Sequence, residues 1–399
     1  MKRARNYLAI ILLAVTAGCG GGKQSTDDII TVDVTKHYPK KELTLQDIFD
    51  VEYIALDTNE EFITAGLIDC ISKDIIIVKN SSMCLDGDIL VFDRNGKGLR
   101  KINRKGQGPE EYIAASYITI DEENDEMIIT DLFGQNYKVY DLFGNFKLSL
   151  KNSRNIQGYG GVFDQEHLIC CKLSGDFVNG KMEGLINEFF IISRKEGCIT
   201  KEIDIPFKEK KWPNLVSPDG SRPSPSPGNL KLIPYKNNWA ITEISSDTIY
   251  SVMPDYSLAP LIVRTPSIQS MDPEVYLFLS VISDRYYFMQ TVKREYNFSM
   301  RTGWPSIELM YDRQECAIFE CVVYNNDFLN KRPVIMNFEN RFLANTFHNN
   351  EIAFFNILQS HELVNSYRNG ELKEGRLKEI AARLDEEDNL VIMIAKHRK

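Results

Sequence analysis

Two short segments carry residue types that could do chemistry, and both depart from a complete motif. His361-Glu362-Leu363-Val364-Asn365 begins like the zinc-binding H-E-x-x-H helix, but Asn365 stands where the second histidine ligand is required. Gly106 and Gly108 begin like a dinucleotide-binding G-x-G-x-x-G loop, but Glu111 stands at the third glycine. A G-x-x-x-x-G-K-S/T phosphate loop and a G-x-S-x-G nucleophile elbow are both missing from the sequence. We therefore assign no catalytic residue, and we expect no cofactor and no bound metal.

The segment Gly106-Gln107-Gly108-Pro109-Glu110-Glu111-Tyr112 is the most distinctive local feature. Its glycines permit unusual backbone torsions, its proline fixes φ, and its glutamates can accept hydrogen bonds. It either lines the mouth of a ligand site or turns the chain between two structural units. Two tryptophans, each followed by proline, are the best candidates for exposed aromatic side chains. The predicted ligand rim comprises Arg104, Gly106, Gln107, Gly108, Pro109, Glu110, Glu111, Tyr112, Trp212 and Trp304.

The first residues carry a targeting signal. Three basic residues lie within residues 1–5, and the apolar stretch over residues 7–17 is shorter than the roughly 20 residues that span a bilayer. This pattern is typical of a secretory signal, here over residues 1–18. Its end, Val15-Thr16-Ala17-Gly18-Cys19, resembles the lipobox of bacterial lipoproteins. That resemblance implies cleavage before Cys19 and lipid attachment to its thiol, whereas the alternative is an ordinary secretory signal followed by a chance cysteine.

Charge and hydropathy limit the functions and locations that are open to the remaining chain. The 399 residues carry 47 basic and 56 acidic side chains, a formal charge of −9, which disfavours non-specific nucleic-acid binding. After the lipid site we expect a polar tether over residues 19–46, and no later apolar run approaches spanning length. The expected location is the cell envelope, with the lipid in the membrane. We assign it to the outer membrane and leave the periplasmic or outer face open.

Short β-rich runs followed by tight turns recur along the chain. Asp88-Ile89-Leu90-Val91-Phe92-Asp93 precedes Arg94-Asn95-Gly96-Lys97, and Tyr137-Lys138-Val139-Tyr140-Asp141 precedes Leu142-Phe143-Gly144-Asn145. Counted from turn-starting residues 93, 141, 193, 255 and 312, the intervals are 48, 52, 62 and 57. A repeat of about 55 residues predicts about six units over residues 51–396.

Stacked repeats of this kind favour a β-propeller. A sheet of three or four short strands cannot bury both faces alone, whereas copies arranged around an axis cover one another. We predict an all-β fold, a single six-bladed propeller over residues 47–399, with a helical insertion at about 371–386. The strands over residues 51–56 and 389–395 should lie together in the last blade and close the ring.

The chain also resembles a known family. A lipobox, the strand Val51-Glu52-Tyr53-Ile54, the segment over residues 106–112 and the turn Asp141-Leu142-Phe143-Gly144 follow one another as in the six-bladed β-propeller lipoproteins of bacteria, which are related to NHL-repeat propellers. The resemblance covers nearly all of the chain after the signal. It implies the fold, and it carries over no catalytic residue.

Three functions remain open on the sequence. The first is a lipid-anchored, non-enzymatic module that binds an unidentified protein or glycan at one face of the ring. The second is a propeller enzyme, a lyase or hydrolase, with carboxylates and a possible metal in the channel. The third is a structural subunit of an envelope complex. Clustered inward carboxylates would favour the enzyme, and an aromatic rim would favour the binding module.

Overall fold

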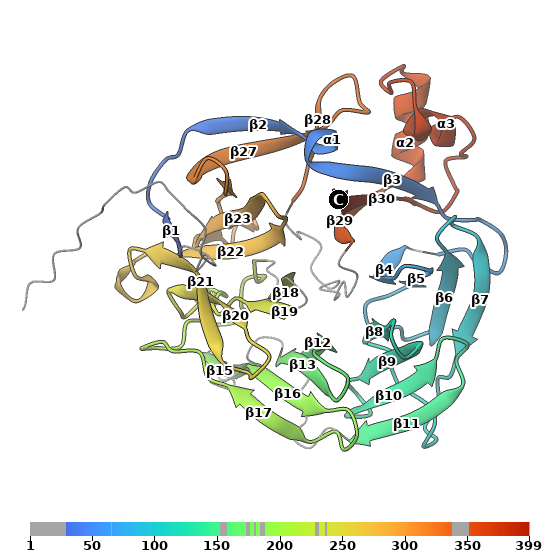
Figure 1. Cartoon of the computed structure of the whole chain (residues 1–399), viewed down its shortest axis with the longest axis horizontal. Coiled ribbons are helices and arrows are strands. Elements are labelled where there is room, and N and C mark those ends of the chain that lie inside the picture. Colours follow the sequence, from blue (N-terminus) through green and yellow to red (C-terminus); the bar gives the residue numbers. More distant parts are fainter. Residues whose placement is uncertain are drawn as a thin grey trace, which may run out of the picture.

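The computed structural model describes residues 29–398 except 65, 152–157, 173–175, 179–180, 184–187, 228–230, 236–237 and 337–350. The predicted signal peptide over residues 1–18 and the predicted lipid site at Cys19 lie outside the described residues. Six sheets surround a central axis and form a β-propeller, as predicted (Figure 1). In the first four blades, successive strands run outward from the axis.

The first three blades each have four strands. Blade 1 contains β4 (Leu67–Ile71), β5 (Ile75–Lys79), β6 (Asp88–Asp93) and β7 (Gly98–Asn103). Blade 2 contains β8 (Tyr117–Asp121), β9 (Glu126–Asp131), β10 (Asn136–Asp141) and β11 (Phe146–Lys151). Blade 3 contains β12 (Gly158–Val162), β13 (His167–Lys172), β16 (Phe189–Ser193) and β17 (Ile199–Ile203), with the inserted hairpin β14 (Asp176–Val178) and β15 (Lys181–Glu183).

The last three blades carry additions to this plan. Blade 4 contains β18 (Leu232–Tyr235), β19 (Asn238–Ile241), β20 (Thr248–Val252) and β21 (Leu258–Thr265), and a 3-10 turn, η1 (Ile268–Ser270), follows it. Blade 5 contains β22 (Val275–Ile282), β23 (Tyr286–Lys293), β26 (Ser306–Asp312), β27 (Ala317–Asn325) and β28 (Arg332–Val334), with the inserted hairpin β24 (Tyr296–Asn297) and β25 (Thr302–Gly303). Blade 6 contains β29 (Ile352–Leu358), β30 (Val391–His397) and β3 (Phe49–Ala55).

The five predicted turns occupy the same place in five blades, between the third and the fourth of the four main strands of each blade. A carboxylate oxygen of Asp93 accepts hydrogen bonds from the backbone N–H of Asn95 (2.7 Å) and Lys97 (3.0 Å). This side-chain turn is the reason that aspartate recurs there. Gly96 supplies the left-handed backbone, at φ 87°, and a Cβ at this position would meet the Ala55 carbonyl oxygen at 1.9 Å.

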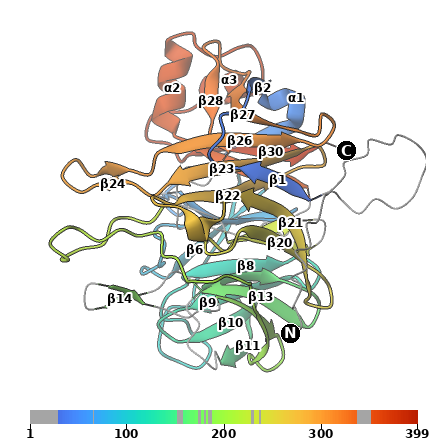
Figure 2. The same cartoon turned by 90° about the vertical axis from the view of Figure 1, so that its left-hand side faces the viewer.

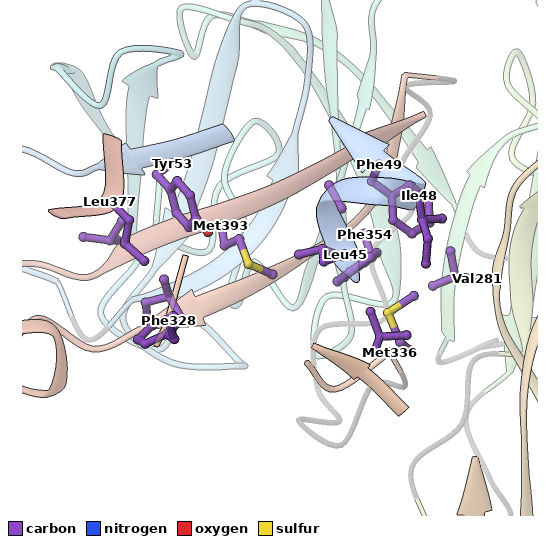
Figure 3. Packing of buried hydrophobic residues seen from close by; sticks show 14 of the residues in the cluster. Leu45, Ile48, Phe49, Tyr53, Val281, Phe328, Met336, Phe354, Leu377 and Met393 are labelled. Carbon is purple, nitrogen blue, oxygen red and sulfur yellow. The ribbon is translucent and has the colours of Figure 1, made fainter. Parts of the chain in front are cut away.

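Blade 6 closes the ring with strands from both ends of the fold. β3 pairs antiparallel with β30 from Phe49 opposite His397 to Ala55 opposite Val391, which confirms the predicted closure. The side chains of Phe49 and Phe354 meet edge to face, with ring centroids 5.6 Å apart. Figure 3 shows this part of the core, where β3, β29 and the short helix α1 (Leu45–Ile48) pack together.

The folded body begins before the predicted boundary at residue 47. β1 (Ile30–Asp33) pairs parallel with β21, and β2 (Lys40–Thr44) pairs parallel with β27 (Figure 1). These two strands, here called the N-terminal strap, lie in the range that we predicted as part of the tether, so that boundary needs correction. β1 alternates apolar and polar residues over only four positions, Ile-Thr-Val-Asp, and β2 has the polar sequence Lys-Lys-Glu-Leu-Thr. The alternation that marks a half-buried strand is therefore short in β1 and missing from β2.

Ion pairs fix the strap to blade 5. The Lys41 ammonium lies 3.3 Å from a carboxylate oxygen of Asp312, and Arg285 contacts both oxygens of that carboxylate, at 3.0 and 2.8 Å. Burial alone would raise the pKa of Asp312, but the bonds from Arg285, backbone N–H groups and Lys41 hold it well below its ordinary value. The strap is therefore held by charge as well as by its strand pairing.

Two helices follow β29. Helix α3 (Arg376–Ala381) lies inside the range predicted as helical, 371–386, and buries Leu377, Ile380 and Ala381 against blade 6. Helix α2 (Ser360–Arg368) precedes it and contains the segment that begins like a zinc-binding motif. Both helices belong to the connection between β29 and β30 and lie outside the ring of sheets (Figure 1).

Candidate functional site

The two ends of the ring differ in the size of their connections. Because neighbouring strands of a blade run antiparallel, the β5–β6 connection, the β7–β8 connection and their equivalents leave from one end. We call this end the loop face. The hairpins β14–β15 and β24–β25, helix α2 and the loop after β17 all extend from it (Figure 2). The opposite end carries the short turns such as residues 94–97.

A hollow of about 650 Å³ lies on the loop face beside blade 5. The hairpin β24–β25 forms most of its wall, and Pro218 from the loop after β17 completes it. It is lined by Glu295, Tyr296, Asn297, Phe298, Ser299, Thr302, Gly303 and Pro305 together with Pro218. An inserted hairpin with its flanking residues and an inserted loop therefore build this hollow.

Two aromatic side chains, Tyr296 and Phe298, line the hollow. The rings of Tyr296 and Phe298 meet edge to face with centroids 5.0 Å apart, and Tyr296 lies 6.1 Å from the ring of Trp304. The Arg222 guanidinium lies over the Phe298 ring, 5.9 Å from its centroid. Rings that pack on one another lose little freedom when a ligand binds, so this surface is preorganised for contact.

Trp304, one of the predicted rim residues, supports this wall in a strained conformation. Its φ is 62°, which is rare for a bulky residue, and its backbone N–H donates to the Glu295 carbonyl (2.7 Å). Its ring packs against the buried residues Tyr276 and Phe278. Its indole nitrogen is buried, and within the described part of the chain it has no hydrogen-bond acceptor. Such strain persists only where the surrounding structure enforces it.

Trp212, the other predicted tryptophan, lies over a cluster of charges between blades 3 and 4. The Lys210 ammonium is 5.4 Å from its ring centroid, 3.0 Å from Glu188 and 2.8 Å from Glu243. Lys231 also contacts the Glu188 carboxylate. Burial raises the pKa of Glu188, but Lys231 and Lys210 outweigh that effect and hold the pKa below its ordinary value. This glutamate is therefore ionised at neutral pH and is a poor proton donor.

The predicted segment over residues 106–112 joins blades 1 and 2. Tyr112 is fully buried, and its hydroxyl donates to the Gly87 carbonyl (2.7 Å) and accepts from the Arg104 backbone N–H (3.1 Å). A Glu111 carboxylate oxygen accepts from the Gly108 backbone N–H (2.8 Å). A Cβ at Gly106 would meet that carboxylate at 1.8 Å, so a larger residue at this position would displace the Glu111 side chain.

Blade 2 holds the same segment from the other side. The Tyr140 hydroxyl donates to the Glu110 carbonyl, and the Lys138 ammonium donates to the Pro109 carbonyl, both at 2.6 Å. Arg104 donates through Nε to the Gly144 carbonyl (3.0 Å). The structure thus brings residues 104–112 together as an interblade joint. The side chains of Gln107, Pro109 and Glu110 are exposed there on the loop face, whereas Trp212 and Trp304 belong to blades 3–5.

One buried ion pair has no signal in the sequence. Lys79 at the end of β5 is 1% exposed, and its ammonium lies 3.0 Å from the Asp69 carboxylate. Asp69 is the extra residue of a β-bulge in β4, and a bulge redirects a side chain. Lys79 also donates to the carbonyls of Ala115 (3.0 Å) and Ser116 (2.7 Å), so it joins blade 1 to the start of blade 2.

None of the described helices is long and apolar enough to cross a membrane. Among the same residues, no group of three or more His, Cys, Asp or Glu side chains is arranged to hold a metal ion.

Solved structures with the same architecture are distant in sequence. A protein of Bacteroides fragilis, described as exported, is 15% identical and covers 93% of this chain and 100% of its own, with a TM-score of 0.57. A member of the duf4221 family from Bacteroides vulgatus is 10% identical over 88% of this chain and 96% of its own, with a TM-score of 0.47. Virginiamycin B lyase from Staphylococcus aureus is 13% identical over 65% of this chain and 73% of its own, with a TM-score of 0.35. At 15% identity, the likeness to the Bacteroides fragilis protein concerns the fold alone.

The comparison with sequence families is more specific. No curated protein matches the chain. The family described as "Domain of unknown function (DUF4934)" matches residues 29–396, from the start of the N-terminal strap almost to the end of β30. The chain therefore belongs to the DUF4934 family.

Proposed function

We propose that this propeller is an exported, lipid-anchored binding module that holds a protein or a glycan at its loop face. The observation that carries the proposal is the hollow walled by the β24–β25 hairpin, where an insertion places aromatic rings beside amide and hydroxyl groups. Concave sites with aromatic walls and a few polar groups are typical of ligand binding. The ring supplies a rigid support for them.

The charge cluster favours binding over acid–base catalysis. Glu188 and Glu243 are each paired with lysine, and the pKa of Glu188 is lowered. A general acid at neutral pH requires a raised carboxyl pKa. In this proposal the cluster fixes the loop after β17, and thereby Trp212 and Pro218, in place above blades 3–5.

The anchor is supported by the sequence of residues 1–19 and by the likeness to an exported protein of the same fold. The proposal places lipid on Cys19 and the propeller in the cell envelope, most naturally at the outer membrane. We expect Cys19→Ala to abolish incorporation of a labelled fatty acid and to shift the protein from the membrane fraction to the soluble fraction. Fractionation with mass spectrometry of the N-terminal peptide measures both. Cys316→Ala, at an exposed cysteine, is the matched control. Unchanged labelling of the Cys19 variant would contradict the anchor.

The binding function is tested by the loss of ligand from a loop-face variant. The tagged full-length protein is purified from native membranes in mild detergent, and mass spectrometry identifies co-purifying proteins and glycans. We expect Tyr296→Ala/Phe298→Ala to reduce the recovered ligand about tenfold or more, because central aromatic residues dominate binding energy. Phe143→Ala is the control, since Phe143 is 68% exposed on a turn at the opposite end of the ring. If no co-purifying species depends on the loop-face rings, the proposed function is wrong.

A further inference from the structure

We propose that the hollow at the β24–β25 hairpin binds an oligosaccharide that carries uronate carboxylates. The inference rests on the binding function proposed above and names the chemical class of the ligand. Two independent features carry it: the aromatic wall of the hollow and the unpaired guanidinium groups beside it.

The aromatic wall suits a sugar ring. Tyr296 and Phe298 are half-buried and line an open hollow, so each ring offers apolar surface to a ligand. The C–H groups of a pyranose form an apolar face that packs on such rings, while its hydroxyl groups remain at the edge. Polar side chains lie there to meet them. Asn297 is held in place because its side-chain oxygen accepts from the backbone N–H of Ser299 (3.0 Å) and Met300 (2.9 Å).

The charge beside the hollow is positive. Among the described residues, no carboxylate lies within ion-pair distance of the Arg222 guanidinium, which lies over the Phe298 ring. Arg301, in the turn between the lining residues Ser299 and Thr302, likewise has no ion-pair partner in the described part of the chain. The one acidic residue that lines the hollow, Glu295, is already paired with Lys293 at 2.5 Å. Asp219, next to the lining residue Pro218, adds one carboxylate, which accepts hydrogen bonds from the hydroxyls of Ser217 and Ser221. The two arginines outnumber it, so the net charge beside the hollow is positive.

The arginine side chains determine which anionic group of a ligand the site can recognise. A guanidinium forms two parallel hydrogen bonds with a carboxylate, and a uronic acid places that carboxylate on the sugar ring itself. A cationic ligand is disfavoured, because Arg222 and Arg301 both place positive charge beside the hollow. The hollow thus combines recognition of a sugar face with recognition of a carboxylate attached to it.

The charge of the whole chain sharpens this specificity. At −9, the chain as a whole repels polyanions, so an acidic ligand must be held by local contacts. A polyanion without sugar rings would lose the aromatic contact, and a neutral sugar would lose the guanidinium contact.

Calorimetric titration of the detergent-solubilised full-length protein tests the inference. The probes are oligogalacturonate, alginate oligosaccharide and hyaluronan oligosaccharide, with methyl-esterified oligogalacturonate as the neutral analogue and polyglutamate as the acidic peptide. We expect at least one uronate probe to bind. We expect Arg222→Ala to weaken that binding about tenfold or more, and Arg222→Lys to restore only part of it, because lysine keeps the charge but loses the fork. Phe298→Ala should weaken binding of the same probe to a similar degree.

The controls separate the possible results. Arg376→Ala replaces an exposed arginine of α3 and should bind the probe as the unmodified protein does. Thermal unfolding checks that every variant is folded. The inference is overturned if the ester binds as tightly as the acid, if polyglutamate displaces the sugar, or if no uronate probe binds. If a co-purifying ligand still depends on Tyr296 and Phe298 in such a case, the binding function stands and only the ligand class is wrong.

Discussion

Replacing Phe49 with alanine is expected to lower the free energy of unfolding by about 3–5 kcal/mol, the usual cost of removing a buried phenylalanine. Phe49 is 1% exposed and contacts the rings of Phe354 in blade 6 and Phe288 in blade 5, with centroids 5.6 and 6.4 Å away. It stands at the start of β3, so its cavity would weaken the joint that closes the ring. Urea unfolding followed by tryptophan fluorescence measures the loss.

The control for this variant is Phe143→Ala, which removes the same atoms from an exposed position. Phe143 is 68% exposed and contacts the Arg100 guanidinium 4.4 Å from its ring centroid. We expect its loss to change the free energy of unfolding by less than about 1 kcal/mol. Equal effects of the two substitutions would show that closure through β3 does not limit the stability of the ring.

Replacing Lys79 with alanine is expected to lower the free energy of unfolding by about 3–5 kcal/mol, independently of the effect at Phe49. The substitution leaves the Asp69 carboxylate in the interior without its cation. The two side chains are 1% and 0% exposed. The carbonyls of Ala115 and Ser116 also lose their donor. Urea unfolding again measures the free energy of unfolding. We expect a single transition whose midpoint moves to a lower urea concentration.

Two further variants test the cause of this loss. Lys101→Ala breaks a partly exposed pair with Asp88 in the same blade, and we expect an effect of less than about 1 kcal/mol. Lys79→Met combined with Asp69→Asn removes both charges, so it should recover part of the stability lost in Lys79→Ala. A double variant less stable than Lys79→Ala would mean that hydrogen bonding, and not the unpaired charge, determines the cost.

The architecture was predictable from the sequence because its signals are local. Asp93 and Asp141 bond to backbone N–H groups within four residues, so the turn chemistry is written in consecutive positions. Hydrophobic runs such as Ile75–Lys79 mark the strands between these turns. Five of the six blades repeat this local pattern, and the interval between repeats was enough to predict the sixth.

Features that depend on distant pairing were not predictable in the same way. β2 pairs with β27, 280 residues further along the chain at Lys40 and Glu320, and its charged sequence resembles a polar tether. The role of Lys79 depends on a bulge at Asp69 and on carbonyl groups of the next blade. Neither arrangement leaves a mark in consecutive residues.

The candidate site shows the same division. Proline and tryptophan marked loops, and this led to Trp304, but the aromatic residues that line the hollow are Tyr296 and Phe298, which no motif distinguishes. Tyr112, predicted at a rim, is buried because its hydroxyl is used between two blades. An aromatic residue in a polar segment therefore has two possible roles, and only the contacts decide between them.

Because β3 pairs with β30, the ring can close only after β30 has been synthesised. β3 is synthesised early, whereas β30, the strand with which it pairs, is synthesised almost last, at residues 391–397. Blades 1–5 can assemble in the meantime, but the edge of β3 that pairs with β30 stays unpaired until then. A chain that stops before residue 391 is thus not a smaller propeller. Such a chain is an open ring with an exposed strand edge. It can aggregate through that edge unless proteases degrade it first.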